Sequence, residues 1–326
     1  MSGTARARFA VATALVAVLG LLAGCDSQQN GDGGGGQDGG DPTEEASSTS
    51  PFTGEELDDG PSPVLAVKID NVEAARPQTG LGDAEIVYVE QVEGGLSRFL
   101  AVYSEDLPDR VGPVRSGRES DLELLEQFGE PAFAYSGIQG ALEPLFEDAS
   151  LFPVPPDVAP EGYSRGSDRP APYNLYGDPA ALLDAALDAS EASDIGFRFG
   201  EPPARGGEAT RKYDVSLPAA GFTFTWSADD ERWQVALDGQ ATDAAPATVV
   251  VQDVSIRESE YHDVTGAYTP YTETTGSGTA TVLRDGRAYD AEWSRPSAED
   301  GTEFTTPDGD PMRFATGPVW VVYQQK

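Results

Sequence analysis

The sequence predicts an α+β protein, with a mixed α/β N-terminal domain at residues 61–205 followed by a mostly-β C-terminal domain at residues 206–326. Short apolar runs alternate with helical patterns up to about residue 200, whereas strand-like segments alone succeed one another after about residue 211. A third observation, an apolar run from Phe9 that ends just before Cys25, predicts a leader ahead of both domains.

Residues 1–24 are expected to be a lipoprotein signal peptide. Arg6 and Arg8 precede the run FAVATALVAVLGLLAG, which is short for a membrane-spanning helix and ends in Leu-Ala-Gly-Cys. That ending resembles the bacterial lipobox, so Cys25 is the expected lipidation site; the alternative is an ordinary signal peptide with an incidental cysteine. We expect a protein that is lipid-anchored at the extracytoplasmic face of the cell membrane. Because Cys25 is the only cysteine, disulfides within the chain are excluded.

Residues 25–60 are expected to form a disordered, acidic, Gly/Ser-rich tether, because they contain almost nothing that a core could bury. The chain as a whole has a formal net charge of −35. So acidic a protein repels nucleic acid, and the membrane, through the lipid anchor, is its expected partner. The acidity itself needs no cationic partner, since solubility or a GC-rich genome explains it equally well.

The N-terminal domain should contain three early strands, at residues 64–70, 84–92 and 96–104. The last two are expected to form a hairpin across Glu93-Gly94-Gly95. Apolar spacing predicts a helix over 116–129, and residues 131–138 read as a returning strand. Asp178 followed by Pro179 predicts the start of a second helix.

In the C-terminal domain, Asp-Gly pairs at 238–239, 285–286 and 308–309 are typical hairpin turns between strands. Helical periodicity is absent from this part of the sequence. We therefore expect a small barrel or sandwich.

The stretch RVGPVRSGRES, residues 110–120, gathers arginines in a very acidic chain. Ser116 and Glu119 match a capping box, which would place Arg115 and Arg118 beside a helix N-terminus. Backbone N–H groups there favour an anion, and arginine adds planar donors for carboxylate or phosphate. The alternative is that the arginines pair with carboxylates of their own domain, such as Asp70, Glu90 or Glu93.

Further polar side chains cluster around the ends of the first strands and in the loop 164–178. Together with the arginine stretch they give the candidate ligand-binding set Asp70, Asn71, Arg76, Gln78, Glu90, Glu93, Arg98, Arg115, Ser116, Arg118 and Asn174. Glu90 and Glu93 could also form an acid–base pair of a glycan hydrolase, or ion pairs with the nearby arginines. The catalytic residues, if any exist, are not identified by these patterns.

Missing motifs limit the chemistry further. His262 is the only histidine, and the sequence has no HExxH, CxxC, P-loop or strand-following GxGxxG. A histidine-rich zinc site is excluded, and we expect no cofactor and no metal, although a carboxylate-only calcium or magnesium site is left open.

Several longer motifs resemble the YerB-like bacterial lipoproteins, a two-domain family of unknown function. The N-terminal motifs are VKIDN (67–71), ARPQTGL (75–81), AEIVY (84–88), VEGG (92–95), SRFLAVY (97–103), GPVRS (112–116) and RPAPYNLY (169–176). The C-terminal motifs are TTGSGTATVLRDGRAYDAEWSRPS (274–297), FTTPDG (304–309) and GPVWVVY (317–323). The resemblance implies an anchored envelope lipoprotein and supplies no activity.

The expected function is recognition of an anionic or polyhydroxylated cell-envelope ligand, such as a cell-wall fragment or the carboxylate tail of an envelope protein. The patterns favour a binding protein over an enzyme. Two alternatives remain: the wall-glycan hydrolase that uses Glu90 and Glu93, and a non-catalytic scaffold whose arginines are satisfied internally.

Overall fold

The computed structural model describes residues 48–262 and 268–326. The predicted signal peptide, the lipidation site Cys25 and most of the predicted tether lie outside these residues. The α-helices are α1 (Glu119–Leu125), α2 (Glu143–Asp148) and α3 (Pro179–Asp184). None of the helices in the described parts is long and apolar enough to cross a membrane.

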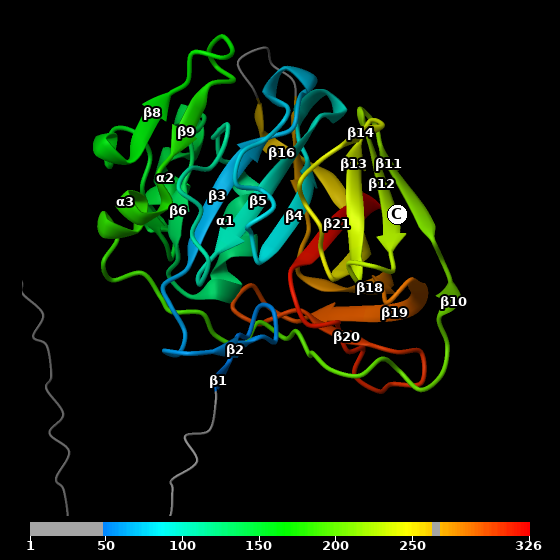
Figure 1. Ribbon diagram of the computed structural model, residues 1–326. Helices are drawn as coiled ribbons and strands as arrows, with labels where there is room; N and C mark the ends of the chain where they lie inside the picture. The colour runs from blue at the N-terminus through cyan, green and yellow to red at the C-terminus, as the bar shows by residue number, and fades with distance from the viewer. Residues whose placement is uncertain (1–47, 263–267) are drawn as a thin grey trace, which may run out of the picture. The chain divides into compact units, whose positions relative to one another are not determined.

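Strands dominate the structure, in agreement with the predicted fold class (Figure 1). In the N-terminal half they are β1 (Ser48–Thr49), β2 (Glu56–Leu57), β3 (Leu65–Asp70), β4 (Ile86–Gln91), β5 (Ser97–Tyr103), β6 (Ala132–Ala134), β7 (Phe152–Pro153), β8 (Tyr163–Arg165) and β9 (Leu175–Gly177). In the C-terminal half they are β10 (Glu208–Ala209), β11 (Lys212–Leu217), β12 (Ala220–Ser227), β13 (Arg232–Leu237), β14 (Gln240–Ala241), β15 (Thr248–Val254), β16 (Ile256–His262), β17 (Tyr268–Thr272), β18 (Gly276–Arg284), β19 (Arg287–Arg295), β20 (Glu303–Thr305) and β21 (Val319–Gln325).

One large mixed sheet runs through both halves of the described chain. Its strand order is β10-β19-β18-β15-β21-β4-β5-β3-β6-β7, with β20 paired to β19. Strand β21 lies between β15 and β4 and is parallel to both. The sheet therefore crosses the expected boundary at residues 205 and 206, while the position of that boundary stays a prediction.

Apolar side chains fill both faces of this sheet. On one face, the antiparallel sheet β11–β14 contributes Phe222, Phe224 and Trp233 to a core shared with Phe99 and Trp320. The ring centroids of Phe99 and Trp320 are 5.5 Å apart. On the other face, the α1 region contributes buried residues to a second core. Burial on both faces explains the nearly continuous apolar runs in the central strands.

Local turn chemistry agrees with the sequence in several places. The β4–β5 hairpin turns at Gly94 and Gly95, whose φ angles of +68° and +73° suit glycine. Asp238-Gly239 and Asp285-Gly286 both have positive φ and join antiparallel strands. The carboxylate of Asp178 accepts the Ala181 N–H and caps α3, as predicted.

Three predicted elements are wrong in detail. The tether does not extend to residue 60, because β1 and β2 pair and the Phe52 ring is fully buried 5.5 Å from Phe128. The helix predicted from residue 116 begins only at Glu119. Ser116 does not cap it; instead the Asp121 carboxylate accepts the Arg118 N–H at 2.7 Å. The predicted strand 131–138 is shorter, with β6 ending at Ala134.

Candidate functional site

A cavity of about 360 Å³ opens beside the ends of β4 and β5. Its polar lining is Glu93, Arg98, Arg115, Ser116, Arg118 and Gln139, and its apolar lining is Val92, Leu96, Ile138 and Leu142. The cavity thus gathers five residues of the predicted set.

Three features of the chain bring these side chains together. The β4–β5 hairpin supplies Glu93 at its turn and Arg98 on the returning strand. Arg98 pairs in register with Asp70 of β3 on one side and with Glu90 of β4 on the other. The loop before α1 is held against β3, because the Arg115 N–H donates to the Lys68 carbonyl at 2.7 Å.

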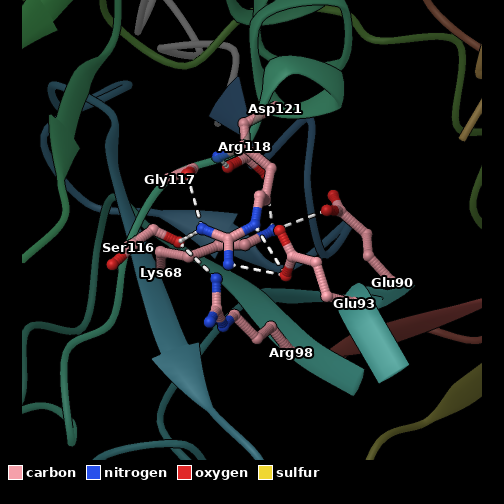
Figure 2. A network of polar contacts seen from close by, with 8 residues as sticks. All are labelled: Lys68, Glu90, Glu93, Arg98, Ser116, Gly117, Arg118 and Asp121. Atoms are coloured by element: carbon pink, nitrogen blue, oxygen red, sulfur yellow. Dashed lines mark hydrogen bonds and ion pairs between the residues drawn. The ribbon is translucent and has the colours of Figure 1, made fainter. Parts of the chain in front are cut away.

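Arg118 is fully engaged with its own protein. Its Nε and Nη2 donate to Oε2 of Glu93 at 3.1 and 2.7 Å, and its Nη1 donates to the carbonyls of Ser116 and Gly117 (Figure 2). The other oxygen of Glu93 accepts from the Thr269 hydroxyl. Burial tends to raise the pKa of Glu93, but the hydrogen bonds and the charge of Arg118 outweigh it and hold the pKa below its usual range.

Among the described residues, Arg98 has no carboxylate within ion-pair distance, unlike Arg118. Its Nη1 donates to the Ser116 carbonyl at 2.9 Å, and its buried Nε has no hydrogen-bond partner in the described parts of the chain. The residue is 7% exposed. Burial, followed by repulsion from Arg118, lowers the pKa of Arg98 to about 10, so the guanidinium remains charged at neutral pH.

Arg115 is intermediate between these two arginines. Its Nε lies 3.1 Å from Oδ2 of Asp70, and its guanidinium carbon lies 5.9 Å from the centre of the Tyr173 ring. Within residues 48–262 and 268–326 no hydrogen bond from its two Nη atoms is found, and 27% of the side chain is exposed. Arg115 therefore keeps donor capacity toward the cavity.

Lys68, Glu90 and Asp121 form a closed buried cluster that does not line the cavity. The Lys68 ammonium lies 2.5 Å from one oxygen of each carboxylate, and all three side chains are at most 2% exposed. Burial raises the pKa of Glu90; the charge of Lys68 opposes that rise and the charge of Asp121 adds to it. The predicted hydrolase pair is therefore wrong in its geometry, since Glu93 lines the cavity and Glu90 does not.

Four other predicted residues serve the architecture outside the cavity. Arg76 binds Asn71 through its side-chain and backbone oxygens and forms an ion pair with Asp238 at 2.6 Å. Gln78 donates to the Asp70 carbonyl and to the Asn71 side chain. Asn174 fixes the loop 164–178, accepting from Arg165 and donating to the Gly166 carbonyl.

The arrangement also corrects the predicted source of anion affinity. Helix α1 has only seven residues, and the Asp121 carboxylate lies at its N-terminus, where it accepts the N–H of the N-cap residue Arg118. The helix end thus offers no anion site, and the donors that remain are guanidinium groups. The sequence did not predict the apolar side of the cavity. Its signal in the sequence was Leu96, a leucine directly after the Gly94-Gly95 turn, which is exposed in the structure.

In the described residues, no group of three or more His, Cys, Asp or Glu side chains is placed to hold a metal ion. The polar side chains of the cavity lining offer ionic and hydrogen-bonding recognition.

Two family descriptions match this chain. The "Protein of unknown function (DUF3048) N-terminal domain" matches residues 52–193, and the corresponding C-terminal domain matches residues 213–321. The chain belongs to the DUF3048 family. This confirms the resemblance found in the sequence and the two-domain architecture.

Two individual proteins are similar to the chain. "Putative lipoprotein YerB" of Bacillus subtilis (strain 168) is 24% identical over 266 residues, which cover 79% of this chain and 80% of the relative. The crystal structure of the YerB protein from Bacillus subtilis matches with a TM-score of 0.71 and 21% identity, covering 85% of this chain and 96% of the other. At that identity the structural match establishes the fold alone.

Proposed function

We propose that this protein is a lipid-anchored, extracytoplasmic binding protein whose cavity captures an anionic ligand of the cell envelope. The observation that carries the proposal is Arg98, a charged guanidinium in the cavity wall with no carboxylate partner in the described residues. A buried cation without a counter-charge costs free energy, and an anionic ligand would recover it.

Arg115 would be the second donor to the ligand. Its Nε forms an ion pair with Asp70 at 3.1 Å, and both Nη atoms are left for an incoming oxyanion. Together, Arg98 and Arg115 offer planar donor pairs from two neighbouring segments of the chain. Arg118 has the different task of fixing the hairpin turn through Glu93.

The alternative hypothesis, a non-catalytic scaffold whose arginines pair within the protein, explains part of the same region. Arg118, Lys68 and Arg76 are saturated by partners of this chain, as that hypothesis requires. Arg98 is not, and it lies in a cavity. Binding is thus favoured by the one arginine of the cavity wall that lacks an ion pair among the described residues.

The test is a comparison of acetate with chloride at equal ionic strength. A ligand that binds only the folded protein raises its free energy of unfolding by RT ln(1 + [L]/Kd). We expect acetate to raise the melting temperature of the full-length chain in a saturable way. Arg98→Gln should abolish the difference between the two salts, whereas the exposed control Arg287→Gln, which donates to the Gly207 carbonyl, should retain it.

Equal responses of the parent chain and Arg98→Gln across the whole acetate titration would refute binding at this cavity. The same titration followed by amide NMR shifts near Leu96 and Ser116 checks the location independently of stability.

The anchor is supported by the lipobox-like ending at Cys25 and by the name of the similar Bacillus protein, "Putative lipoprotein YerB". We expect Cys25→Ser to move the protein from the membrane fraction to the soluble fraction of the producing bacterium. Retention of the serine variant in the membrane fraction would contradict acylation.

A further inference from the structure

The cavity joins its cationic donors to an apolar wall. Val92, Leu96, Ile138 and Leu142 face the same space as Arg98 and Arg115. Leu96 is 40% exposed, one of only a few large apolar side chains in the described residues that are so open to solvent. Val92 and Leu142 are each 2% exposed, so the apolar surface left for a ligand to cover belongs to Leu96 and Ile138. Covering that surface with apolar atoms of a ligand would lower the free energy.

The charges around the cavity also limit the charge of the ligand. Arg118 is neutralised by Glu93, and Arg115 is paired with Asp70. Among the described residues, Arg98 is the lining arginine without an ion pair, so the three arginines exceed their two carboxylate partners by one positive charge. Both oxygens of Glu93 are occupied by donors of this chain, so Glu93 stays ionised and would repel a second negative charge.

The neighbouring buried cluster adds no positive charge to this balance: it is neutral when Glu90 is protonated and carries one negative charge when Glu90 is ionised. Lys68 is shared between Glu90 and Asp121, and neither state of Glu90 leaves more than the equivalent of one positive charge near the cavity. A dianion such as inorganic phosphate would therefore carry one charge that no described cation compensates.

Resting on the proposed function, we infer that the ligand class is a singly charged oxyanion attached to an apolar group. The oxyanion lies between the guanidinium groups of Arg98 and Arg115, and the apolar group covers Leu96 and Ile138. Gln139, also in the lining, adds a neutral hydrogen-bonding group at the same cavity. A carboxylate and a phosphodiester share this chemistry.

The experiment measures dissociation constants of six probes for the full-length chain by NMR titration at constant ionic strength. The carboxylates are acetate, butyrate and hexanoate; the others are adipate with two charges, 1-hexanol with none, and dibutyl phosphate. Each fully buried methylene should tighten binding about fourfold. We expect hexanoate to bind at least about tenfold tighter than acetate, adipate and 1-hexanol. The ratio of hexanoate to dibutyl phosphate then identifies the oxyanion.

Leu96→Ala should flatten the dependence on chain length, because it removes the exposed apolar side chain that the longer probes would cover. The matched control is Leu187→Ala, at a leucine that is 83% exposed outside the cavity lining. It should retain the full dependence.

The two proposals fail in different ways. If acetate and hexanoate bind equally, or if adipate binds as tightly as hexanoate, while Arg98→Gln still abolishes binding, the ligand class is wrong and the anion site stands. If no charged probe binds in an Arg98-dependent manner, both proposals are wrong.

Discussion

Two clusters of charged side chains lie around β3, β4 and β5 and the segment that leads into α1, and they differ in how their donors are used. In the first cluster, Lys68 forms ion pairs with Glu90 and Asp121, and all three side chains are at most 2% exposed. In the second, Arg98 and Arg115 line a cavity and keep unused N–H groups. The number of arginines and lysines in the sequence does not distinguish the two clusters. What distinguishes them is the number of N–H groups that have no partner within the protein, because only those groups are available to a ligand.

The largest effect is expected at the closed cluster. Lys68→Met removes the cation and leaves two buried carboxylates facing each other, which should lower the free energy of unfolding by about 3–5 kcal/mol. Urea denaturation at neutral pH measures this. A loss below about 1 kcal/mol would mean that the buried cluster contributes no more than a surface pair, and the comparison would fail.

Glu85, a buried carboxylate with no ion-pair partner among the described residues, sharpens the comparison through pH. Oε1 and Oε2 of Glu85 accept the N–H groups of Glu105 and Ser104, yet burial outweighs these bonds and raises the pKa of Glu85 to about 7. In the unfolded chain Glu85 titrates near 4.5. The folded state therefore binds the proton more tightly, and the resulting stability is complete below pH 4.5 and lost as the pH rises through 7.

From this shift we expect the free energy of unfolding to fall by about 3 kcal/mol between pH 4.5 and pH 8 on account of Glu85. Denaturant titrations of the parent chain and of Glu85→Gln across that range measure the difference in slope. The pKa of Glu90 is also raised, but its contribution to the pH dependence is the same in both proteins and cancels in the difference. Parallel curves for the two proteins would contradict the shift.

A smaller effect is expected at Arg118, the arginine of the cavity lining that is paired with Glu93. Arg118→Gln removes the two hydrogen bonds to Glu93 and should cost about 2 kcal/mol. Because Arg118 holds the pKa of Glu93 low, stability present above the usual carboxylate pKa is lost as the pH falls, and the variant should lose less of its stability toward pH 3. The double variant Arg118→Gln/Glu93→Gln should show a coupling free energy of about 1 kcal/mol between the two substitutions. Additive effects of the two substitutions would mean that the ion pair does not contribute to stability.

The smallest effect on stability is expected at the arginine proposed to meet the ligand. Arg98→Gln loses one hydrogen bond, to the Ser116 carbonyl, and also removes a buried unpaired charge. These changes oppose each other, so the free energy of unfolding should change by about 1 kcal/mol or less. Thermal unfolding without added anion measures it. A loss as large as that of Lys68→Met would mean that Arg98 stabilises the fold and is not held in reserve for a ligand.

Local elements of the fold could be predicted because their causes lie within a few residues. Gly94-Gly95 and Asp285-Gly286 mark hairpins through positive φ, and Asp178 marks a helix start through its carboxylate. The start of α1 was predicted wrongly because a second acceptor, Asp121, competes with Ser116 for the capping role. The pairing of β21 between β15 and β4 joins residues far apart in sequence, and an apolar run carries no information about its partners.

The candidate site shows the same limit. The sequence identified Arg98, Arg115, Arg118 and Glu93, and the cavity brings these four together. It could not show that Arg118 rather than Arg98 would take Glu93, because that choice depends on side-chain directions around the hairpin turn. Nor could it place Ile138 and Leu142 beside them, since they follow β6, two strands away in the sheet.

Strand β21 has a consequence for how the chain reaches its final state. It fills the position between β4 and β15 and is contributed by residues 319–325. Until those residues leave the ribosome, β4 presents a bare apolar edge on which other chains could polymerise. The N-terminal half is therefore not expected to fold before the C-terminal half has been synthesised. If the chain is divided near residue 205, each fragment alone should aggregate, and the two should be soluble only when they are produced together.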